Sequence, residues 1–397
     1  MPYIKKLRVK NYRVLKDLAL DDLQPLNVVL GPNGCGKSTL FDVFGFLSDS
    51  LQTNVRKALE PRGRFRELRS RGASEPIEFE IQYRESDFLI NKRALSPLIT
   101  YILSIDSVKE KPEITQEILM WKQRKLSGQP FRFLDMKKGV GQAITGKDPE
   151  TDDEKIDVNL DSSDILAVKA LGQFGENPRI ASLSRFIEGW FLSYFVPEQS
   201  RQIPEAGAKE HLSRSGENLP NVIQYLAEDK PEILKEILDR VTKKIPGLES
   251  VDSKRTEDGR LVLRFKDGPF NDPFLAKFVS DGTIKMLAYF ALLMDPDPPP
   301  LLCIEEPENG LHPRLLDILV EEFRSHSTKT QVFVSTYSPR LVNSLRPEEL
   351  WIMDRDPDTG FATIERADKI SGIPEFVREG AALGDLWTED QFRRGKP

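Results

Sequence analysis

The chain has 397 residues, enough for two or three ordinary domains or for one domain with a large insertion. Hydrophobic residues make up 39% and charged residues 30%, and no apolar stretch approaches the roughly 18 to 20 residues of a membrane helix. We therefore expect a soluble protein with no membrane partner. The net charge of −6 excludes a molecule that is basic as a whole, so any nucleic-acid binding must come from local patches.

The start of the chain and the cysteines both indicate a cytoplasmic protein. Residues 1–20 lack the continuous apolar segment of a signal peptide. The two cysteines, Cys35 and Cys303, lie inside apolar or glycine-rich motifs rather than in a spaced framework. We expect no disulfide bond.

The first part of the chain predicts strands followed by a helix. Residues 1–30 read as strands and end in the compact apolar run LNVVL, which precedes a glycine-rich turn. A helix is expected over residues 38–51. A basic stretch from Arg56 to Arg71 follows, and then residues 77–85 alternate apolar and polar side chains, which predicts a strand with one buried face.

The middle of the chain, from about residue 95 to 260, has the weakest periodicity. Helical spacing occurs over residues 182–195, 218–228 and 231–245, the last with Pro231 where a helix begins. A hairpin is predicted to turn at Asp258 and Gly259. From residue 278 onward helical and strand patterns alternate, which favours a parallel α/β sheet.

A phosphate-binding loop is predicted at GPNGCGKST, residues 31–39, which fits G-x-x-x-x-G-K-[ST] between a strand and a helix. Gly31 and Gly36 permit backbone angles that let consecutive N–H groups turn onto phosphate oxygens. Lys37 adds a positive charge, Ser38 offers a hydroxyl to Mg²⁺, and the N-terminus of the following helix favours an anion. A plain glycine turn is the alternative.

Two adjacent acids, Glu305 and Glu306, end an apolar run that reads as a buried strand. An unpaired buried carboxylate costs several kcal/mol, so such a pair needs a metal, a basic partner or open water. In P-loop NTPases a carboxylate at the end of a neighbouring strand serves the metal, and a further acid orients the attacking water. Two acids at a solvated strand end remain the alternative.

The order of four motifs resembles the ABC-type ATPase heads of the RecF, SMC and OLD group. These motifs are the P-loop, SDGT at 280–283, EEPENGLHP at 305–313 and STYSP at 335–339, and LRVKNYRVL near the start resembles the first strand of those heads. The resemblance covers about half of the chain. It implies a P-loop NTPase of the α/β class with a mixed, partly parallel sheet, an antiparallel N-terminal lobe and a mostly helical insertion.

The resemblance also implies domain boundaries. Residues 1–95 form the N-terminal part of the head, 96–260 a mostly helical insertion, 261–370 the C-terminal part of the head, and 371–397 a tail. No sustained heptads lie between the P-loop and SDGT, so we expect no coiled-coil arm. Fewer than fifty residues follow Leu350, too few for a Toprim nuclease domain, and Asp354 and Asp356 read as part of a hairpin turn.

In these heads the signature motif docks on the γ-phosphate held by a second subunit, so the resemblance implies an ATP-dependent homodimer with ATP and Mg²⁺ bound. The alternative is that SDGT serves only as the N-terminal cap of a helix. His312 lies in the segment that resembles the D-loop, where helix entry beside Pro313 is the favoured role. Gln173 is the candidate for the glutamine loop.

Tyr337 stands where the family usually has a histidine. Tyrosine can donate a hydrogen bond but carries no positive charge at pH 7, so we expect slow hydrolysis. Glu305 departs from the more frequent aspartate, as OLD-like heads often do. The expected site residues fall into three groups. The catalytic group is Glu306, Lys37 and Tyr337; the nucleotide group is Gly31, Pro32, Asn33, Gly34, Cys35, Gly36, Lys37, Ser38, Thr39, Ser280, Asp281 and Gly282; and the metal group is Ser38 and Glu305.

Two basic stretches are candidate DNA contacts. Residues 56–71 hold seven basic side chains against two acids, and residues 122–138 mix Lys and Arg with aromatic residues. Ordinary solvated faces or a partner-docking surface are the alternative for each.

The sequence therefore predicts a slow ATPase that controls contact with DNA or with a separate nuclease or other effector, in DNA repair or anti-phage defence. A nucleotide-dependent assembly module with little hydrolysis is the competing interpretation, and Tyr337 favours it. The ATPase subunit of a transporter is disfavoured because the L-S-G-G-Q form is absent.

Overall fold

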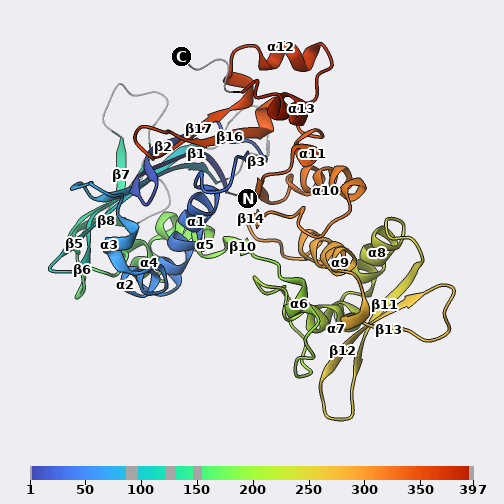
Figure 1. Cartoon of the computed structure of the whole chain (residues 1–397). Helices are drawn as coiled ribbons and strands as arrows, with labels where there is room; N and C mark the ends of the chain where they lie inside the picture. Colours follow the sequence, from blue (N-terminus) through green and yellow to red (C-terminus); the bar gives the residue numbers. More distant parts are fainter. Residues whose placement is uncertain (1, 86–96, 122–129, 146–153, 393–397) are drawn as a thin grey trace. The chain divides into compact units, whose positions relative to one another are not determined.

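The computed structural model describes residues 2–85, 97–121, 130–145 and 154–392 (Figure 1). The chain forms two compact units. The first contains Met1–Trp190, Arg346–Glu379 and Phe392–Pro397, and the second contains Phe191–Leu345 and Gly380–Gln391. Among the described residues, no helix is long and apolar enough to span a membrane.

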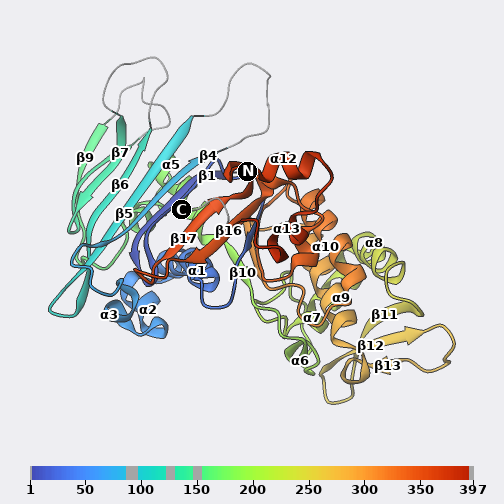
Figure 2. The same ribbon diagram turned by 45° about the horizontal axis from the view of Figure 1, so that its top comes forward.

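An antiparallel sheet makes up much of the first unit. Its strands lie in the order β2–β1–β4–β5–β6–β7–β8–β9, and each neighbouring pair is antiparallel (Figure 2). Their bounds are β1 (Tyr3–Tyr12), β2 (Leu15–Asp21), β4 (Ile77–Arg84), β5 (Leu98–Val108), β6 (Lys111–Trp121), β7 (Phe131–Lys137), β8 (Val140–Thr145) and β9 (Glu154–Asn159). This is the expected antiparallel lobe, and it extends well beyond residue 95.

The expectation that residues 96–260 are mostly helical is wrong for the stretch from β5 to β9. In β5 the side chains of Ile99, Tyr101, Leu103 and Ile105 are all buried, which is the period-two pattern of a strand. β-branched and aromatic residues at these alternate positions favour extended backbone. Among the described residues of 96–260, the helices follow β9.

Helices of the first unit pack on the antiparallel sheet. Phe46 of α1 contacts Phe79 of β4 at 5.7 Å between ring centroids, and Tyr83 of β4 contacts Phe186 of α5 at 5.4 Å. The alternation predicted for residues 77–85 is confirmed, since alternate side chains of β4 are buried. The helices are α1 (Lys37–Gln52), α2 (Val55–Leu59), α3 (Arg64–Leu68), α4 (Ala167–Leu171), α5 (Pro178–Glu188) and α12 (Ile373–Arg378).

A second group of strands in the first unit begins with β3 (Leu26–Leu30), which is buried throughout. β3 is parallel to β16 (Leu350–Arg355), and β16 is antiparallel to β17 (Ala362–Arg366). The turn between them is closed by Asp356, whose carboxylate accepts the backbone N–H groups of Asp358 and Thr359. This is the hairpin turn that was predicted there.

The second unit contains parallel strands and helices. β14 (Leu301–Glu305) lies between β10 (Phe191–Ser193) and β15 (Gln331–Thr336), and both pairings are parallel. The helix expected over 182–195 ends at Glu188 in the first unit, because the chain turns at Gly189 and enters β10. The helices of the second unit are α6 (Pro197–Ser200), α7 (Leu219–Asp229), α8 (Pro231–Thr242), α9 (Asp281–Leu293), α10 (Pro313–His326), α11 (Pro339–Val342) and α13 (Leu383–Thr388).

A small antiparallel sheet completes the second unit. It contains β11 (Leu248–Arg255), β12 (Leu261–Asp267) and β13 (Phe274–Leu275). β11 and β12 form the predicted hairpin, in which Gly259 adopts a φ of +82° that favours glycine.

Candidate functional site

The turn between β3 and α1 depends on its glycines. Gly34 and Gly36 have φ values of +80° and +117°, in the region that other residues rarely adopt. A Cβ atom added at Gly31 would lie 2.2 Å from the carbonyl oxygen of Met353, closer than atoms pack. Glycine is therefore required by space at position 31 and favoured by the backbone angles at positions 34 and 36.

Lys37 begins α1 and turns back over the loop. It is 6% exposed, and its ammonium group donates to the carbonyl oxygens of Gly31 at 2.7 Å and Pro32 at 3.1 Å. Ser38 is exposed beside it. α1 has neither a side-chain cap nor an acid in its first turn, so its N-terminus suits an anion.

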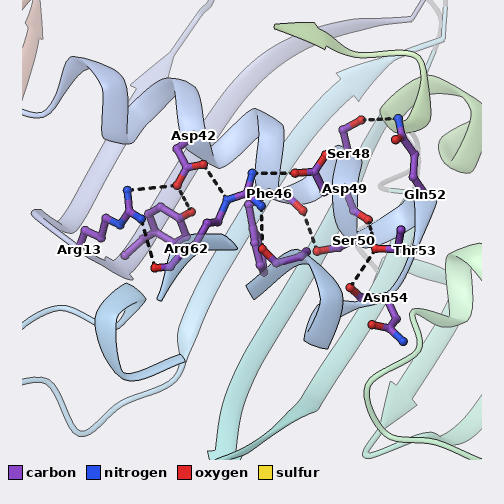
Figure 3. A network of polar contacts seen from close by, with 12 residues as sticks. Arg13, Asp42, Phe46, Ser48, Asp49, Ser50, Gln52, Thr53, Asn54 and Arg62 are labelled. Carbon is purple, nitrogen blue, oxygen red and sulfur yellow. Dashed lines mark hydrogen bonds and ion pairs between the residues drawn. The ribbon is translucent and has the colours of Figure 1, made fainter. Parts of the chain in front are cut away.

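A polar network connects α1 to neighbouring segments of the first unit (Figure 3). Asp42 accepts hydrogen bonds from Arg62 and from Tyr12, each at 2.7 Å, and forms an ion pair with Arg13 at 3.3 Å. Arg62 also donates to Asp49 at 2.8 Å and is only 10% exposed as a side chain. The helix that follows the glycine turn is thus fixed to the turn after β1 and to the Arg62 segment.

The two acids lie at the end of β14 in the second unit. Glu305 is the last residue of the strand and is half-buried. Glu306 adopts a φ of +43°, and its backbone N–H donates to the carbonyl oxygen of Ser335 at 2.9 Å. A positive φ at a residue other than glycine is costly and occurs often at functional sites. The chain therefore turns sharply at the second acid.

Asn309 connects this acid to the next strand. Its side-chain amide donates to the Glu306 carboxylate at 3.0 Å, and its side-chain oxygen accepts a hydrogen bond from the hydroxyl of Tyr337. Its backbone oxygen accepts from the ammonium group of Lys285 at 2.7 Å. We call this set of contacts the Asn309 bridge. It joins the end of β14, the residue after β15 and helix α9.

Two charged side chains beside the bridge are buried. Lys285 is 4% exposed, and burial lowers its pKa against the opposing influence of Glu308. Burial raises the pKa of Glu308, although its carboxylate accepts hydrogen bonds from Thr336 and from the backbone N–H of Tyr337. The second oxygen of that carboxylate is buried without a hydrogen-bond partner among the described residues.

Ser280, Asp281 and Gly282 open helix α9. The Ser280 hydroxyl caps the helix by accepting the backbone N–H of Thr283 at 3.3 Å, and Asp281 forms an ion pair with Arg201. A Cβ at Gly282 would lie 3.0 Å from the carbonyl oxygen of Gly310. The close approach of α9 to the segment after the two acids therefore needs glycine.

Tyr337 is a partly exposed hydrogen-bond donor, whereas His312 caps a helix. The side chain of Tyr337 is 45% exposed, and burial together with the charges of Glu308 and Glu306 raises its pKa. Its hydroxyl is therefore protonated at neutral pH and acts as a neutral donor. His312 caps α10 by accepting the backbone N–H of Arg314 at 3.2 Å, as expected for helix entry beside Pro313.

A family model matches residues 26–343, which is more than half of the chain, and includes the glycine turn, the two acids and Tyr337. Its description is "AAA domain, putative AbiEii toxin, Type IV TA system". The chain belongs to this AAA-domain family. No curated protein matches the chain in sequence.

Solved structures show which fold this AAA-domain protein has. An Smc head bound to the C-winged helix domain of ScpA is 13% identical, with a TM-score of 0.55, over 91% of this chain and 97% of that one. An Smc head with an extended coiled coil, bound to the C-terminal domain of ScpA from Pyrococcus furiosus, is 13% identical, with a TM-score of 0.50, over 95% and 100%. The predicted α/β fold of an ABC-type P-loop NTPase head is therefore confirmed.

The predicted site residues are distributed over both units of the AAA-domain protein. Residues 31–39 lie in the first unit, on one turn and the start of one helix. Residues 280–282, Glu305, Glu306 and Tyr337 lie in the second unit, where the Asn309 bridge joins Glu306 to Tyr337. Gln173 lies exposed in the turn after α4.

Some residues of the site were not predicted. Sequence reasoning missed Asn309, Glu308, Lys285 and Arg62. Each of them bonds to a partner 13 or more positions away in the chain, although Asn309 also bonds to Glu306, three positions before it. The one signal available in the sequence was Lys285, the single charged residue of the apolar run 284–293, because a lysine is rarely buried without a partner. Of the second basic stretch, Lys122–Lys125 lie outside the described residues.

Proposed function

We propose that this AAA-domain protein binds and slowly hydrolyses Mg-ATP, forms a head-to-tail homodimer with ATP between the subunits, and so controls access to DNA or to a separate effector such as a nuclease. The observation that carries the proposal is the glycine turn of residues 31–36, with Lys37 folded over it at an uncapped helix N-terminus. That arrangement offers backbone N–H groups and a positive charge to phosphates.

The P-loop residues fit the phosphates of a nucleotide. In the proposed site the backbone from Gly31 to Gly36 and the Lys37 ammonium group bind phosphate oxygens, while Ser38 and Glu305 hold Mg²⁺. Bound Mg²⁺ neutralises charge that develops on the phosphates. No group of three or more His, Cys, Asp or Glu residues suited to a metal occurs in the described part of the chain. Mg²⁺ does not need one, since it binds through one or two protein ligands, phosphates and water.

Glu306 is the proposed general base, and Tyr337 is the proposed catalytic hydrogen-bond donor beside it. The Asn309 bridge supports this assignment because it holds both side chains on a common partner. A neutral tyrosine donates one hydrogen bond but supplies no positive charge to the transition state, so we propose slow turnover. The same feature favours the second candidate function, an assembly module whose output is the closed dimer and whose hydrolysis is negligible.

Ser280, Asp281 and Gly282 are proposed to meet the nucleotide held by the partner copy. The exposed position of Ser280 at the start of α9 supports this role. In this structure the Ser280 hydroxyl caps α9 and Asp281 pairs with Arg201, so docking on a phosphate requires the hydroxyl to change its partner. We further propose a cytoplasmic protein of the RecF or OLD-like group that acts in DNA repair or anti-phage defence. The family description names a putative toxin, which favours the defence setting.

The first experiment compares the mass in solution of Glu306→Gln with and without Mg-ATP, alongside phosphate release by the native protein. We expect Glu306→Gln to be a monomer alone and a dimer with Mg-ATP, because it binds ATP but cannot remove a proton from water. Native protein should release phosphate slowly. Glu321→Gln, an exposed residue of α10 in the same unit, is the matched control and should behave as the native protein.

Two outcomes separate the candidate functions. An ATP-dependent dimer with phosphate release in the native protein supports the ATPase, and the same dimer without phosphate release supports the assembly module. A mass that is indifferent to nucleotide, with no phosphate released, contradicts both. Lys37→Ala, which removes the phosphate-binding charge, should abolish the mass change in either case.

A further inference from the structure

A surface groove lies in the first unit beside α3. One cavity of about 480 Å³ is bounded mainly by residues 63–73, with Ser107 and Glu110. A second cavity of about 320 Å³ shares Arg64, Phe65 and Glu110 with it and adds residues from α2 and from the start of β6. We call the two cavities together the basic groove. Its charged residues are Arg56, Arg64, Arg66, Arg69, Arg71, Lys111, Glu60, Glu67 and Glu110.

Positive charge dominates the groove although the whole chain is acidic. Six of the lining side chains are basic and three are acidic, whereas the chain carries a net charge of −6. Charge of one sign concentrated in a concave surface attracts ligands of the opposite sign. The groove is therefore suited to a polyanion.

The basic residues of the run from Arg56 to Arg71 differ in availability. Arg62 is bound to Asp42 and Asp49 of α1 and does not line the groove. Arg64 and Arg66 are exposed on α3, and neither has an ion-pair partner among the described residues. These two guanidinium groups are the ones free to bind a ligand.

Arg69 and Arg71 line the groove, although each of them also forms an ion pair. Arg69 pairs with Asp106 at 3.2 Å and lies over the ring of Phe65, and Arg71 pairs with Glu67 at 2.7 Å. The side chains of the Arg69 pair are 31% and 30% exposed and those of the Arg71 pair 75% and 48%, and solvent-accessible ion pairs of this kind are weak. A phosphate can therefore compete for either guanidinium group.

A buried hydroxyl in the lining gives independent support. Ser70 lines the larger cavity and is 2% exposed, and its hydroxyl has no hydrogen-bond partner among the described residues. Native proteins rarely leave a buried polar group unpartnered, and a functional ligand is one reason for it. An acceptor oxygen of a bound phosphate would satisfy this hydroxyl.

We propose that the basic groove binds consecutive phosphates of a nucleic-acid strand, with Arg64, Arg66 and Ser70 as its principal contacts. A strand fits better than a small phosphorylated molecule because the cations extend over two adjoining cavities, as repeated phosphates require. The inference rests on the DNA-engaging part of the proposed function. It does not depend on ATP hydrolysis or on the dimer.

The test measures binding of a fluorescent 30-nucleotide DNA, as a single strand and as a duplex, without ATP and at several salt concentrations. We expect Arg64→Glu with Arg66→Glu to weaken binding at least tenfold. The slope of log affinity against log salt should fall by roughly 0.7 to 0.9 for each lost phosphate contact. The matched control, Lys254→Glu with Arg255→Glu on exposed positions of β11, makes the same change in net charge and should stay within twofold of native protein.

Ser70→Ala separates the ligand contact from a structural role. Because the hydroxyl has no partner among the described residues, its removal should leave the melting temperature unchanged or raise it, while DNA affinity falls several-fold. Because binding is measured without ATP, a failed ATPase does not disturb this measurement.

Several results would overturn the proposal. They are native protein that does not bind DNA without ATP, an equal loss in the groove and control variants, or full affinity in Ser70→Ala. Competition by inorganic phosphate or a nucleoside monophosphate at the concentration at which the 30-mer binds would identify a small-molecule site instead.

Discussion

The carboxyl group of Glu117 predicts a pH-dependent contribution to stability. Glu117 is 1% exposed and accepts hydrogen bonds from Tyr101 and from the backbone N–H groups of Ala167 and Val168 at the start of α4. Burial nevertheless raises its pKa from 4.5 to about 7. Between these two values the folded protein binds more protons than the unfolded chain, so the free energy of unfolding falls as pH rises through this interval.

The size of the effect follows from the two pKa values. A pKa change from 4.5 to about 7 corresponds to about 3 kcal/mol, present below pH 4.5 and lost above pH 7. Glu117→Gln removes the titration. It also leaves one backbone N–H without an acceptor, which costs about 1 to 3 kcal/mol at every pH. We therefore expect the stability of native protein relative to Glu117→Gln to fall by about 3 kcal/mol between pH 4.5 and 8.

Urea unfolding of both proteins at several pH values measures this difference, and subtraction removes the titration of groups that they share. Glu75→Gln, at an exposed position in the same unit, is the control and should follow native protein at every pH. A stability difference between native protein and Glu117→Gln that does not change with pH would refute the reasoning. It would mean that the three hydrogen bonds outweigh burial of the charge.

Two further predictions concern the candidate site. Tyr337→His should raise the rate of phosphate release if the missing positive charge limits turnover, and an unchanged rate in a steady-state assay contradicts that explanation. Gly31→Ala should lose both ATP binding and stability, because its Cβ would lie 2.2 Å from the Met353 carbonyl oxygen. Gly34→Ala has open space and should cost only about 1 kcal/mol for its positive φ, so equal melting temperatures for the two variants would contradict the prediction.

Local features of the chain could be predicted from the sequence. The glycine turn is a contiguous segment whose backbone angles are set by its own residues, and the strand β4 is visible in alternate side chains. Helix starts at Pro231 and Ser280 also follow local rules. Each of these depends on residues within a few positions of one another.

Features that depend on distant partners could not be predicted. Composition identified the basic run from Arg56 to Arg71, but only the fold shows that Arg62 pairs with acids of α1 and that Arg64 and Arg66 line a groove. The setting of Glu117 could not be predicted either, since its two backbone partners lie about fifty residues further along the chain. The strand β5 was missed although its alternate side chains are apolar, whereas in β6 the alternation is interrupted between Thr115 and Met120.

The Asn309 bridge leads to the last prediction. If its side chain positions Glu306 and Tyr337, Asn309→Ala removes two hydrogen bonds at an exposed site, worth about 1 kcal/mol together, and should slow phosphate release about fivefold. Asn309→Asp keeps the acceptor for Tyr337 but sets a second carboxylate beside Glu306. Like charges at this distance disfavour ionisation, so the acid limb of its pH–rate profile should move to higher pH.

The two variants together distinguish positioning from packing. A residue that only supports the fold would change the rate through stability, and the pH–rate profile would keep its shape in both variants. If the pH–rate profile moves in Asn309→Asp and not in Asn309→Ala, a charge at position 309 must interact with the charge of Glu306 during turnover. Unchanged turnover in Asn309→Ala, with native stability, would remove Asn309 from the site. It would also leave Glu306 positioned only by its own backbone, which bonds to Ser335 and turns through a positive φ.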